Sequence, residues 1–575
     1  MTHSKRSFKK GIAAVASVMA IALMTVSCGQ SGVNSPQTTP PATVSPSGTA
    51  PVEGGFSSDP NLNEPGVFPI AKETVTLKIG LAQSANVSDY KTNKYTKMLE
   101  EKGNFNLEFE LYPSNEATQK IELMIAAGGT DLPEILIRGL EDRAVATYGS
   151  GGYFLPINDY IEHSSYYLKA QLERTADKNL AAYFTSPDGN IYTVPSYAES
   201  IVNEFDRRLW LYQPWLDELG VSAPTTTDEY RALLEKIKAT DLNKNGKADE
   251  IPLMGATTGF FSYYFDFLMT SFIYSDESRD WMVLEDGKIN FAYTTEEWKE
   301  GLKYLRDLCL DDLLLPVSFT QDDAQAKQIM NNPDATLVGT AIIGSPSMLA
   351  GDDNRRTEYV SASPLAGPSG IKQSIFRPTL PNPTAYITMN AKNPEAAFRL
   401  LDLMMSDEAT VWNRWGEPEV DWRGPTANEK GAYENMGYPA MIVPILAWGS
   451  VQNAHWQNGA PCFRTYEVAG GLTVDTDNPL SSAITLEVAE ADAIEFELKP
   501  DEIIYKIMYT GEEMDTISEI KANLKTYVKE KNAAYITGYT DIDADWSNFL
   551  NELEKIGLGQ FLEISQTAYD RTVGK

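Results

Sequence analysis

The stretch from Asp241 to Pro252, DLNKNGKADEIP, carries side chains that could bind a metal ion. Its oxygen-bearing residues alternate as in the calcium loop of an EF-hand, with a glycine for the sharp turn. The twelfth position, where an EF-hand has a bidentate glutamate, is a proline, and an acid two positions earlier can replace it. We therefore predict a structural Ca²⁺ site with the ligands Asp241, Asn243, Asn245, the carbonyl of Lys247, Asp249 and Glu250. The alternative is a polar turn without an ion.

A second acidic alternation, DIDAD at 541–545, is followed by Trp546 where the turn glycine would be. We interpret it as the N-terminal cap of a helix. EF-hand calcium sensors normally pair two loops, and no second loop accompanies the first. The predicted ion therefore serves stability rather than signalling.

Aromatic residues cluster at 260–267, 411–422 and 446–456. Aromatic rings stack on the apolar faces of sugars, while neighbouring polar groups bind the hydroxyls. The segment 411–422 mixes aromatic and charged residues with Gly and Pro, which suits a ligand-binding loop better than a helix face. The predicted ligand-binding residues are Trp210, Tyr264, Trp412, Trp415, Glu417, Asp421, Trp422, Arg423, Trp448 and Trp456. For any single ring, a place in the core is an equal alternative.

Sequence signatures of catalysis are absent. The chain contains no GxxxxGK[ST], GxGxxG, GxSxG or HExxH motif. After removal of a leader only His163 and His455 remain, which argues against histidine-based nucleophilic catalysis. Paired acids for glycoside cleavage are available, but 80 acidic residues offer such pairs by abundance alone. We predict that the protein is not an enzyme.

The N-terminal part has the features of an exported lipoprotein. A basic start is followed by a short apolar run, GIAAVASVMAIALM, which predicts a signal peptide at 1–27 rather than a membrane span. Cys28 follows as a candidate lipidated (palmitate-bearing) residue, with ordinary cleavage as the alternative. Residues 28–68, rich in Gly, Ser, Thr and Pro, are predicted to be a flexible tether before a folded part at 69–575.

The net charge limits the possible binding partners, and the cysteine content limits the possible disulfides. Loss of residues 1–27 removes Lys5, Arg6, Lys9 and Lys10 and no acid, so the net charge changes from −32 to −36. A body this acidic is a poor partner for nucleic acid, and the acidity mildly favours a neutral ligand. The remaining cysteines, at 309 and 462, could form one disulfide or stay as two buried thiols.

The elements that must position these residues follow an α/β pattern. Strands are predicted at TVTLKIGLA, NFNLEFELYP and PEILI, with helices at NKYTKMLEEKG and QKIELMIAAGG between them. This alternation is typical of a parallel sheet. Further helices are predicted at TTTDEYRALLEKIKAT, TTEEWKEGLKYLRDLCL, ISEIKANLKTYVKEK and DWSNFLNELEKIG, the last ending at Gly557.

Taken together, several stretches resemble one known family. They are WLDELGVSAPTTTDEYRALLEKIKATDLNKNGKADEIPL, DGKINFAYTTEEWKEGLKYLRDL, SPLAGPSG, NPEAAFRLLDLMMSDEA and ITGYTDIDADWSNFLNELEKIGLGQFLEI. The chain is similar over 74–571 to the extracellular solute-binding lipoproteins (family 1) of bacterial ABC importers, in the long oligosaccharide-binding branch. The resemblance also implies that the loop at 241–250 holds calcium.

That resemblance implies a periplasmic-binding-protein-like type II α/β fold. Two α/β lobes would be joined by hinge crossovers, expected near 190–205, 330–345 and 385–400, and would close over a ligand in the cleft. The implied function is capture of an oligosaccharide for an ABC permease, by a monomer anchored through Cys28 to the outer face of the cell membrane. The alternatives are a surface glycoside hydrolase or lyase and a non-transport surface adhesin.

Overall fold

The computed structural model describes residues 58–574 except 176, 345–347, 350–352, 476 and 478. The predicted signal peptide, Cys28 and the tether up to residue 57 lie outside the described residues. Residues 58–68 belong to the folded part: Leu62 is buried, and Ser58 Oγ and Asp59 N–H donate hydrogen bonds of 3.0 and 2.6 Å to the buried Glu395. The predicted boundary at 69 is therefore wrong, because these few residues gain a buried leucine and a buried acceptor despite their polar composition.

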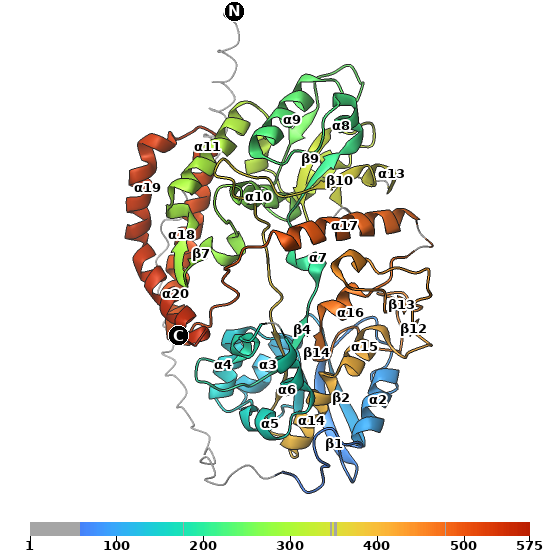
Figure 1. Ribbon diagram of the computed structural model, residues 1–575. Helices are drawn as coiled ribbons and strands as arrows, with labels where there is room; N and C mark the ends of the chain where they lie inside the picture. Colours follow the sequence, from blue (N-terminus) through green and yellow to red (C-terminus); the bar gives the residue numbers. More distant parts are fainter. Residues whose placement is uncertain are drawn as a thin grey trace, which may run out of the picture. The chain divides into compact units, whose positions relative to one another are not determined.

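The first of two large sheets has six strands in the order β14-β4-β11-β3-β1-β2. Strands β1, β2, β4 and β14 of this sheet are labelled in the lower half of Figure 1. Neighbouring strands are parallel except β11, which runs antiparallel to β3 and β4. The strands are β1 (Val75–Gln83), β2 (Phe105–Pro113), β3 (Ile135–Ile137), β4 (Val194–Ala198), β11 (Asn382–Ile387) and β14 (Cys462–Arg464).

Helices cover this sheet on both faces. Ile135 and Ile137 belong to one apolar core and Leu136 to another, as the two-residue period of a strand requires. The accompanying helices are α2 (Lys94–Gly103), α3 (Ala117–Ala126), α4 (Asp142–Ser150), α5 (Asn158–His163), α6 (Tyr167–Arg174), α14 (Pro394–Met404), α15 (Asp407–Trp415) and α16 (Tyr466–Gly470). The predicted opening order of strands and helices is confirmed.

The second sheet has four strands in the order β10-β5-β9-β6. They are β5 (Arg208–Tyr212), β6 (Ile251–Leu253), β9 (Val338–Ile343) and β10 (Tyr359–Ala362), with β6 and β9 parallel and the other pairs antiparallel. Two short ribbons are β7 (Met282–Glu285) with β8 (Lys288–Phe291) and β12 (Trp422–Arg423) with β13 (Val443–Pro444).

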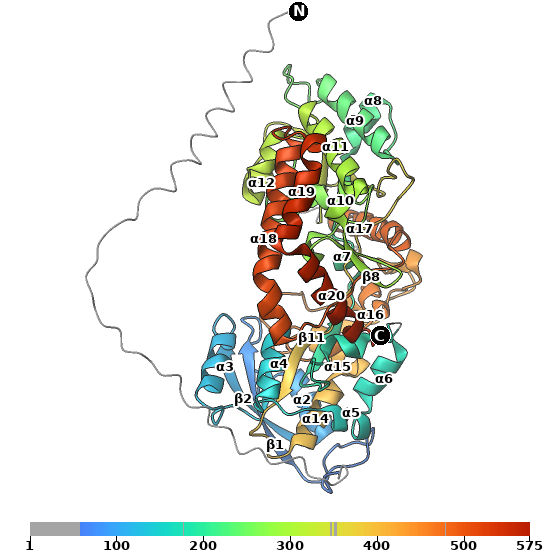
Figure 2. The same cartoon turned by 90° about the vertical axis from the view of Figure 1, so that its left-hand side faces the viewer.

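The largest apolar core surrounds this second sheet. The helices of this part are α7 (Ile201–Glu204), α8 (Gln213–Leu219), α9 (Thr227–Ala239), α10 (Tyr264–Met269), α11 (Glu296–Leu310), α12 (Asp323–Met330), α13 (Asp353–Arg356), α17 (Pro479–Glu497), α18 (Gly511–Ile536), α19 (Ile542–Ile556) and α20 (Leu558–Thr572). Short 3₁₀ helices span Leu180–Phe184, Phe260–Tyr263, Glu277–Arg279, Ala292–Thr294, Pro316–Phe319 and Glu434–Met436. The C-terminal helices α18, α19 and α20 pack on one another, and α18 packs on α11 (Figure 2).

Local sequence signals account for several helix ends. Thr226 caps α9 by accepting a hydrogen bond from the N–H of Glu229, which provides a partner for one of the free donors of the first turn. Asp541 caps α19 through the N–H of Ala544, so the prediction for DIDAD is confirmed. Gly557 ends α19 with a φ of 118°, a conformation that favours glycine.

The chain passes between the two sheets at other places than most of those predicted. It leaves the first sheet after β4 and enters the second at β5, which overlaps the expected range 190–205. It returns between β10 and β11 and leaves again after β14. The crossovers predicted at 330–345 and 385–400 are wrong, since β9 lies inside the second sheet and the turn from β11 to α14 belongs to the first. Cys309 on α11 and Cys462 on β14 are both free and buried, so they stay as two buried thiols.

Candidate functional site

Two cavities adjoin at Leu380. The larger, about 1190 Å³, lies at the carboxyl ends of β1, β2 and β3, where it is lined by Gln83, Pro113 and Arg138. Ligands of α/β sheets bind at this end of the strands. The second cavity, of about 1000 Å³, is lined by residues from the parts of the chain that belong to both sheets. Trp415 and Arg464 belong to the part with the first sheet, Phe260 to the part with the second, and Asp206 to the segment between β4 and β5. Together they form the candidate ligand site.

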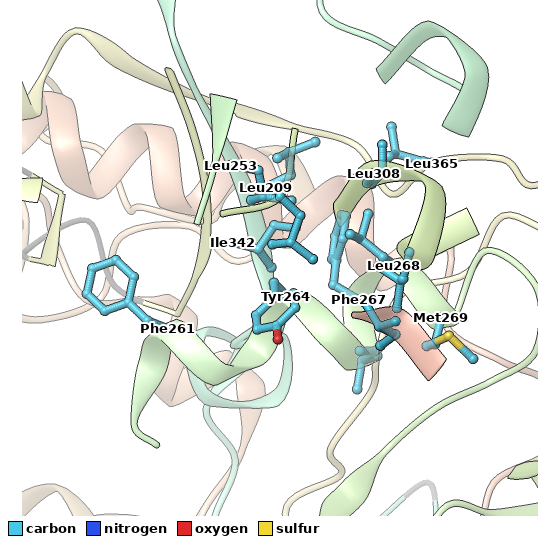
Figure 3. Close-up of a cluster of buried hydrophobic side chains, with 14 of the residues drawn as sticks. Leu209, Leu253, Phe261, Tyr264, Phe267, Leu268, Met269, Leu308, Ile342 and Leu365 are labelled. Carbon is cyan, nitrogen blue, oxygen red and sulfur yellow. The ribbon is translucent and has the colours of Figure 1, made fainter. Parts of the chain in front are cut away.

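Two of the predicted ligand-binding residues belong to the core of the second sheet. Trp210 on β5 is 1% exposed and donates its indole N–H to the carbonyl of Ile343 at 3.1 Å. Tyr264 on α10 lies among apolar side chains such as Leu268 (Figure 3). Both assignments are corrected: aromatic composition suggested a ligand surface, but every residue of β5 is buried, and Tyr264 lies on a short helix most of whose residues are buried as well.

Trp456 is also a core residue, although one edge of it reaches the larger cavity. Its ring packs edge-on against Tyr90 and Tyr95, with centroids 5.6 and 5.2 Å apart, and its N–H donates to Thr96 Oγ1 at 2.9 Å. These contacts hold the indole in the core of the first sheet, so Trp456 contributes little surface to the cavity wall.

The segment 411–422 begins as a helix rather than a loop, since α15 continues to Trp415. Trp415 lines the second cavity. Trp448 is 53% exposed, and the guanidinium of Arg414 lies over both rings, 5.0 Å from the centroid of Trp415 and 4.3 Å from that of Trp448. The structure therefore brings two predicted tryptophans together around an arginine that was not among the predicted residues.

The other predicted residues of this region are not part of the lining of the second cavity. Glu417 and Asp421 both pair with Lys94, at 3.0 and 3.1 Å, which ties the segment to α2. Arg423 pairs with Glu429 at 2.7 Å. Trp412 and Trp422 line a smaller hollow of about 360 Å³.

His455 stacks on Trp448 with centroids 6.0 Å apart and rings nearly parallel. Its pKa is lowered to about 4, chiefly by burial; Asp421 opposes the shift and Arg414 adds to it. The imidazole is therefore neutral at pH 7 and acts as an aromatic spacer beneath the exposed indole.

Several charged residues of the second cavity were not predicted from the sequence. Asp206 accepts hydrogen bonds from Arg207 at 3.0 Å and from Arg377 at 2.9 Å. Glu204 accepts from the hydroxyl of Tyr466 at 2.5 Å. Glu204, Asp206 and Arg207 lie between β4 and β5, and Arg377 lies between β10 and β11. These are the segments in which the chain passes from one sheet to the other, and they carry no aromatic cluster, so only the route of the chain could have identified them.

The loop at 241–250, predicted to bind calcium, folds as a tight turn. Lys244 and Gly246 have φ angles of 58° and 77°. The carboxylate of Asp241 accepts from the backbone N–H groups of Asn245 and Gly246, at 3.1 and 2.9 Å. These hydrogen bonds hold Asp241, at the start of the loop, against the middle of the turn.

The end of the loop folds back onto its start. Glu250 Oε1 accepts from the backbone N–H groups of Leu242 and Asn243, at 2.8 and 3.1 Å. Asp249 accepts from the amides of Asn243 and Asn245, at 2.9 and 3.0 Å. The pKa of Asp249 is lowered by these hydrogen bonds, first by that from Asn243.

The described part of the chain contains neither a cluster of metal-binding side chains nor a membrane-spanning helix. Among the residues described, no three His, Cys, Asp or Glu side chains are grouped so that they could hold a metal ion. In the same residues no helix has the length and apolar character needed to cross a bilayer.

Comparisons with known proteins point in one direction. The chain is 27% identical over 535 residues, 90% of its length and 94% of the relative, to the fructooligosaccharide ABC transporter substrate-binding protein FusA of Streptococcus pneumoniae. FusA in complex with kestose superposes with a TM-score of 0.62 at 24% identity, covering 86% of this chain and 99% of that one. An extracellular solute-binding protein from Bifidobacterium longum subsp. infantis gives a TM-score of 0.69 at 19% identity, covering 88% and 99%.

The fold likeness agrees with the predicted arrangement of two α/β lobes around a cleft. In addition, the family model for bacterial extracellular solute-binding proteins matches residues 94–414, more than half of the chain. Since the family model matches more than half of the chain and the fold agrees with it, the chain belongs to the family of bacterial extracellular solute-binding proteins.

Proposed function

We propose that this protein captures an oligosaccharide outside the cell and delivers it to the membrane permease of an ABC importer. The observation that carries the proposal is the match over nearly the full length to FusA, which is named as the fructooligosaccharide-binding subunit of such a transporter. The relative is a binding protein, and no chemical step on the sugar is invoked for this chain.

The geometry of the cavities supports this function. A space of about 1000 Å³ is large enough for several sugar units, and its lining combines the rings of Trp415, Tyr433 and Tyr505 with charged groups. Rings of this kind stack on sugar faces, while the polar groups select hydroxyl positions. Because the lining comes from segments of both sheets, movement of one sheet relative to the other would open and close it.

The loop at 241–250 fits a structural calcium ion. The oxygens of Asp241, Asn243, Asn245, Asp249 and Glu250 and the carbonyl of Lys247 belong to one turn whose side chains already contact each other. The two asparagines direct amide nitrogens at Asp249, and a half turn of each amide would direct oxygens to the same place. A structure of FusA described as an EF-hand mutant also supports a calcium loop in this family. Calcium bound here would neutralise the acids of the loop and hold the end of α9 to β6.

The location of the protein completes the proposal. Cys28 is lipidated, the tether that follows holds the folded part beside the outer face of the cell membrane, and the protein acts as a monomer. Lipidation would be seen as a mass increase on the N-terminal peptide, which replacement of Cys28 by alanine abolishes.

The proposed function is tested by direct binding. Calorimetric titration with kestose and with a panel of other oligosaccharides should give saturable binding to one of them, accompanied by a change in tryptophan fluorescence. Chromatography of the mixture should return the ligand uncleaved. Variants W415A and Y505A should weaken binding, because both rings line the second cavity. The control Y539A removes a ring that is 83% exposed and does not line that cavity, so it should not weaken binding. Cleaved products, or no saturable binding to any oligosaccharide, would refute the proposal.

A further inference from the structure

Two arginines lie side by side in the second cavity. Arg414 is in the last turn of α15 and Arg464 is the last residue of β14. The helix is fixed to the strand by hydrogen bonds: Phe463 N–H donates to Thr410 Oγ1 at 3.0 Å, and the Asn413 amide donates to the carbonyl of Ala460 at 3.2 Å. Both arginines line the same cavity of about 1000 Å³.

Neither guanidinium has a counter-charge within the described part of the chain. No carboxylate of a described residue lies within 4.0 Å of Arg414 or Arg464, although most arginines of the chain have one. The Nε atoms of both are buried and lack a hydrogen-bond partner. The Cys462 thiol is influenced by both arginines, but burial raises its pKa, so it is uncharged at neutral pH.

Burial and the neighbouring positive charge both disfavour the charged form of these arginines. The pKa of Arg414 is lowered to about 10 by burial and then by the positive charge of Arg464. The pKa of Arg464 is lowered by burial as well. Two like charges in a partly buried place repel each other, and a bound anion would remove that repulsion.

The other charged groups of the lining are already paired. Among the described residues, four arginines and two acids line the cavity. Arg377 pairs with Asp206 at 2.9 Å, and Arg279 donates to the carbonyl of Ile504 at 2.7 Å and pairs with Asp276. The acids in turn accept hydrogen bonds from protein groups. The positive charge of Arg414 and Arg464 therefore remains directed at the ligand space.

We propose that the oligosaccharide taken by this protein carries a carboxylate, as a uronic acid does, and that Arg414 and Arg464 bind that group. This inference rests on the proposed function and names the class of its ligand. A guanidinium presents a planar fork of N–H donors that matches a carboxylate in two parallel hydrogen bonds. The rings of Trp415 and Trp448 hold the Arg414 guanidinium by cation–π contacts, and Trp415 also lines the cavity.

The preference runs against the overall charge of the protein. A net charge of −32 repels an acidic sugar at long range, but screening reduces that effect over about 10 Å at 0.1 M salt. Inside the cavity the local pair of positive charges dominates, because close charges in a partly dry place interact more strongly than distant ones.

The test compares matched acidic and neutral ligands by calorimetry. The panel contains oligogalacturonates, alginate oligosaccharides and glucuronic-acid-bearing xylo-oligosaccharides, each with its methyl-ester form, together with neutral fructooligosaccharides. We expect one acidic ligand to bind and its methyl ester to bind about 10- to 100-fold more weakly. R414Q and R464Q should each reduce the affinity for the acidic form by a similar factor and reduce the affinity for the ester much less, so that the preference for the acid is lost. R306Q, which removes an arginine paired only with its neighbour Asp307, is the control and should change neither.

The outcomes separate the two proposals. Binding of a neutral oligosaccharide with equal affinity to the wild-type protein, R414Q and R464Q would overturn the carboxylate assignment and leave the proposed function standing. Binding of none of the ligands would overturn both. Circular dichroism and thermal midpoints of the apo variants establish that they are folded. Unchanged or higher midpoints are expected, because each substitution removes a repelling charge.

Discussion

Arg208 on β5 and Asp492 on α17 form an ion pair that joins the second sheet to this helix. Removal of the Asp492 carboxylate should destabilise the protein strongly. Both side chains are fully buried, and their charged groups are in direct contact. Arg208 also donates to the carbonyls of Gly344 and Val202, at 2.8 and 3.1 Å. Asp492 accepts the hydroxyl of Tyr433 at 2.6 Å, and that tyrosine lines the second cavity. The variant of choice is D492A.

The size of the effect follows from what D492A leaves behind. Breaking a buried ion pair by removing one partner typically costs about 3–5 kcal/mol, because the other charge stays buried without compensation. Here Glu495, a second buried acid, lies close enough to influence Arg208, and burial raises its pKa well above the usual value. Ionisation of that acid in place of the missing aspartate would offset part of the loss. We therefore expect a decrease in the free energy of unfolding of about 3 kcal/mol, at the lower end of that range.

Urea unfolding followed by tryptophan fluorescence and circular dichroism measures this decrease. The double variant D492A/E495Q should lose more than D492A, since no acid is left for Arg208. The double variant R208M/D492L should lose less than D492A, since both charges are gone. A loss below about 1 kcal/mol for D492A, or a greater loss for R208M/D492L, would refute the reasoning. Loss of the partner of Tyr433 should also weaken ligand binding.

Three further predictions concern other parts of the molecule. The pKa of His455 is lowered to about 4 in the folded protein, whereas an imidazole in the unfolded chain has a pKa of about 6.5. As the pH falls from 7 to 5 the unfolded chain therefore binds a proton at His455 that the folded protein does not, and the free energy of unfolding should decrease by about 2 kcal/mol. Urea unfolding at both values should show this loss, and H455Q should remove it; an equal loss in the variant would contradict the assignment. A chelator should lower the thermal midpoint of a calcium-loaded sample, and E250Q should respond less to added calcium; no response of the loaded wild-type protein would argue against the site. A chain that begins at residue 69 should melt at a lower temperature than one that begins at 58, because Glu395 loses two hydrogen bonds; equal melting would show that residues 58–68 contribute nothing to stability.

The sequence alone determined those features that depend on neighbouring residues. The alternation through β1 and β2, the apolar stripe of α9 and the caps at Thr226 and Asp541 act within a few residues, so pattern and composition were sufficient to predict them. The turn at 241–250 is local in the same sense. The family could be recognised for the same reason, because its most specific stretches are single helices and loops.

Tertiary structure decided what depends on residues far apart in the chain. Trp210, Tyr264 and Trp456 have the composition expected of a ligand surface, yet pairing of strands and packing of helices place them in cores. The crossovers could not be located because β9 and β11 are both short apolar strands, and only their hydrogen-bonded neighbours reveal which sheet each joins. Arg414 and Arg464 are separated by fifty residues, and neither was predicted as a site residue. Their meeting, with no acid of the described residues paired to them, follows from the packing of α15 on β14, which no local pattern encodes.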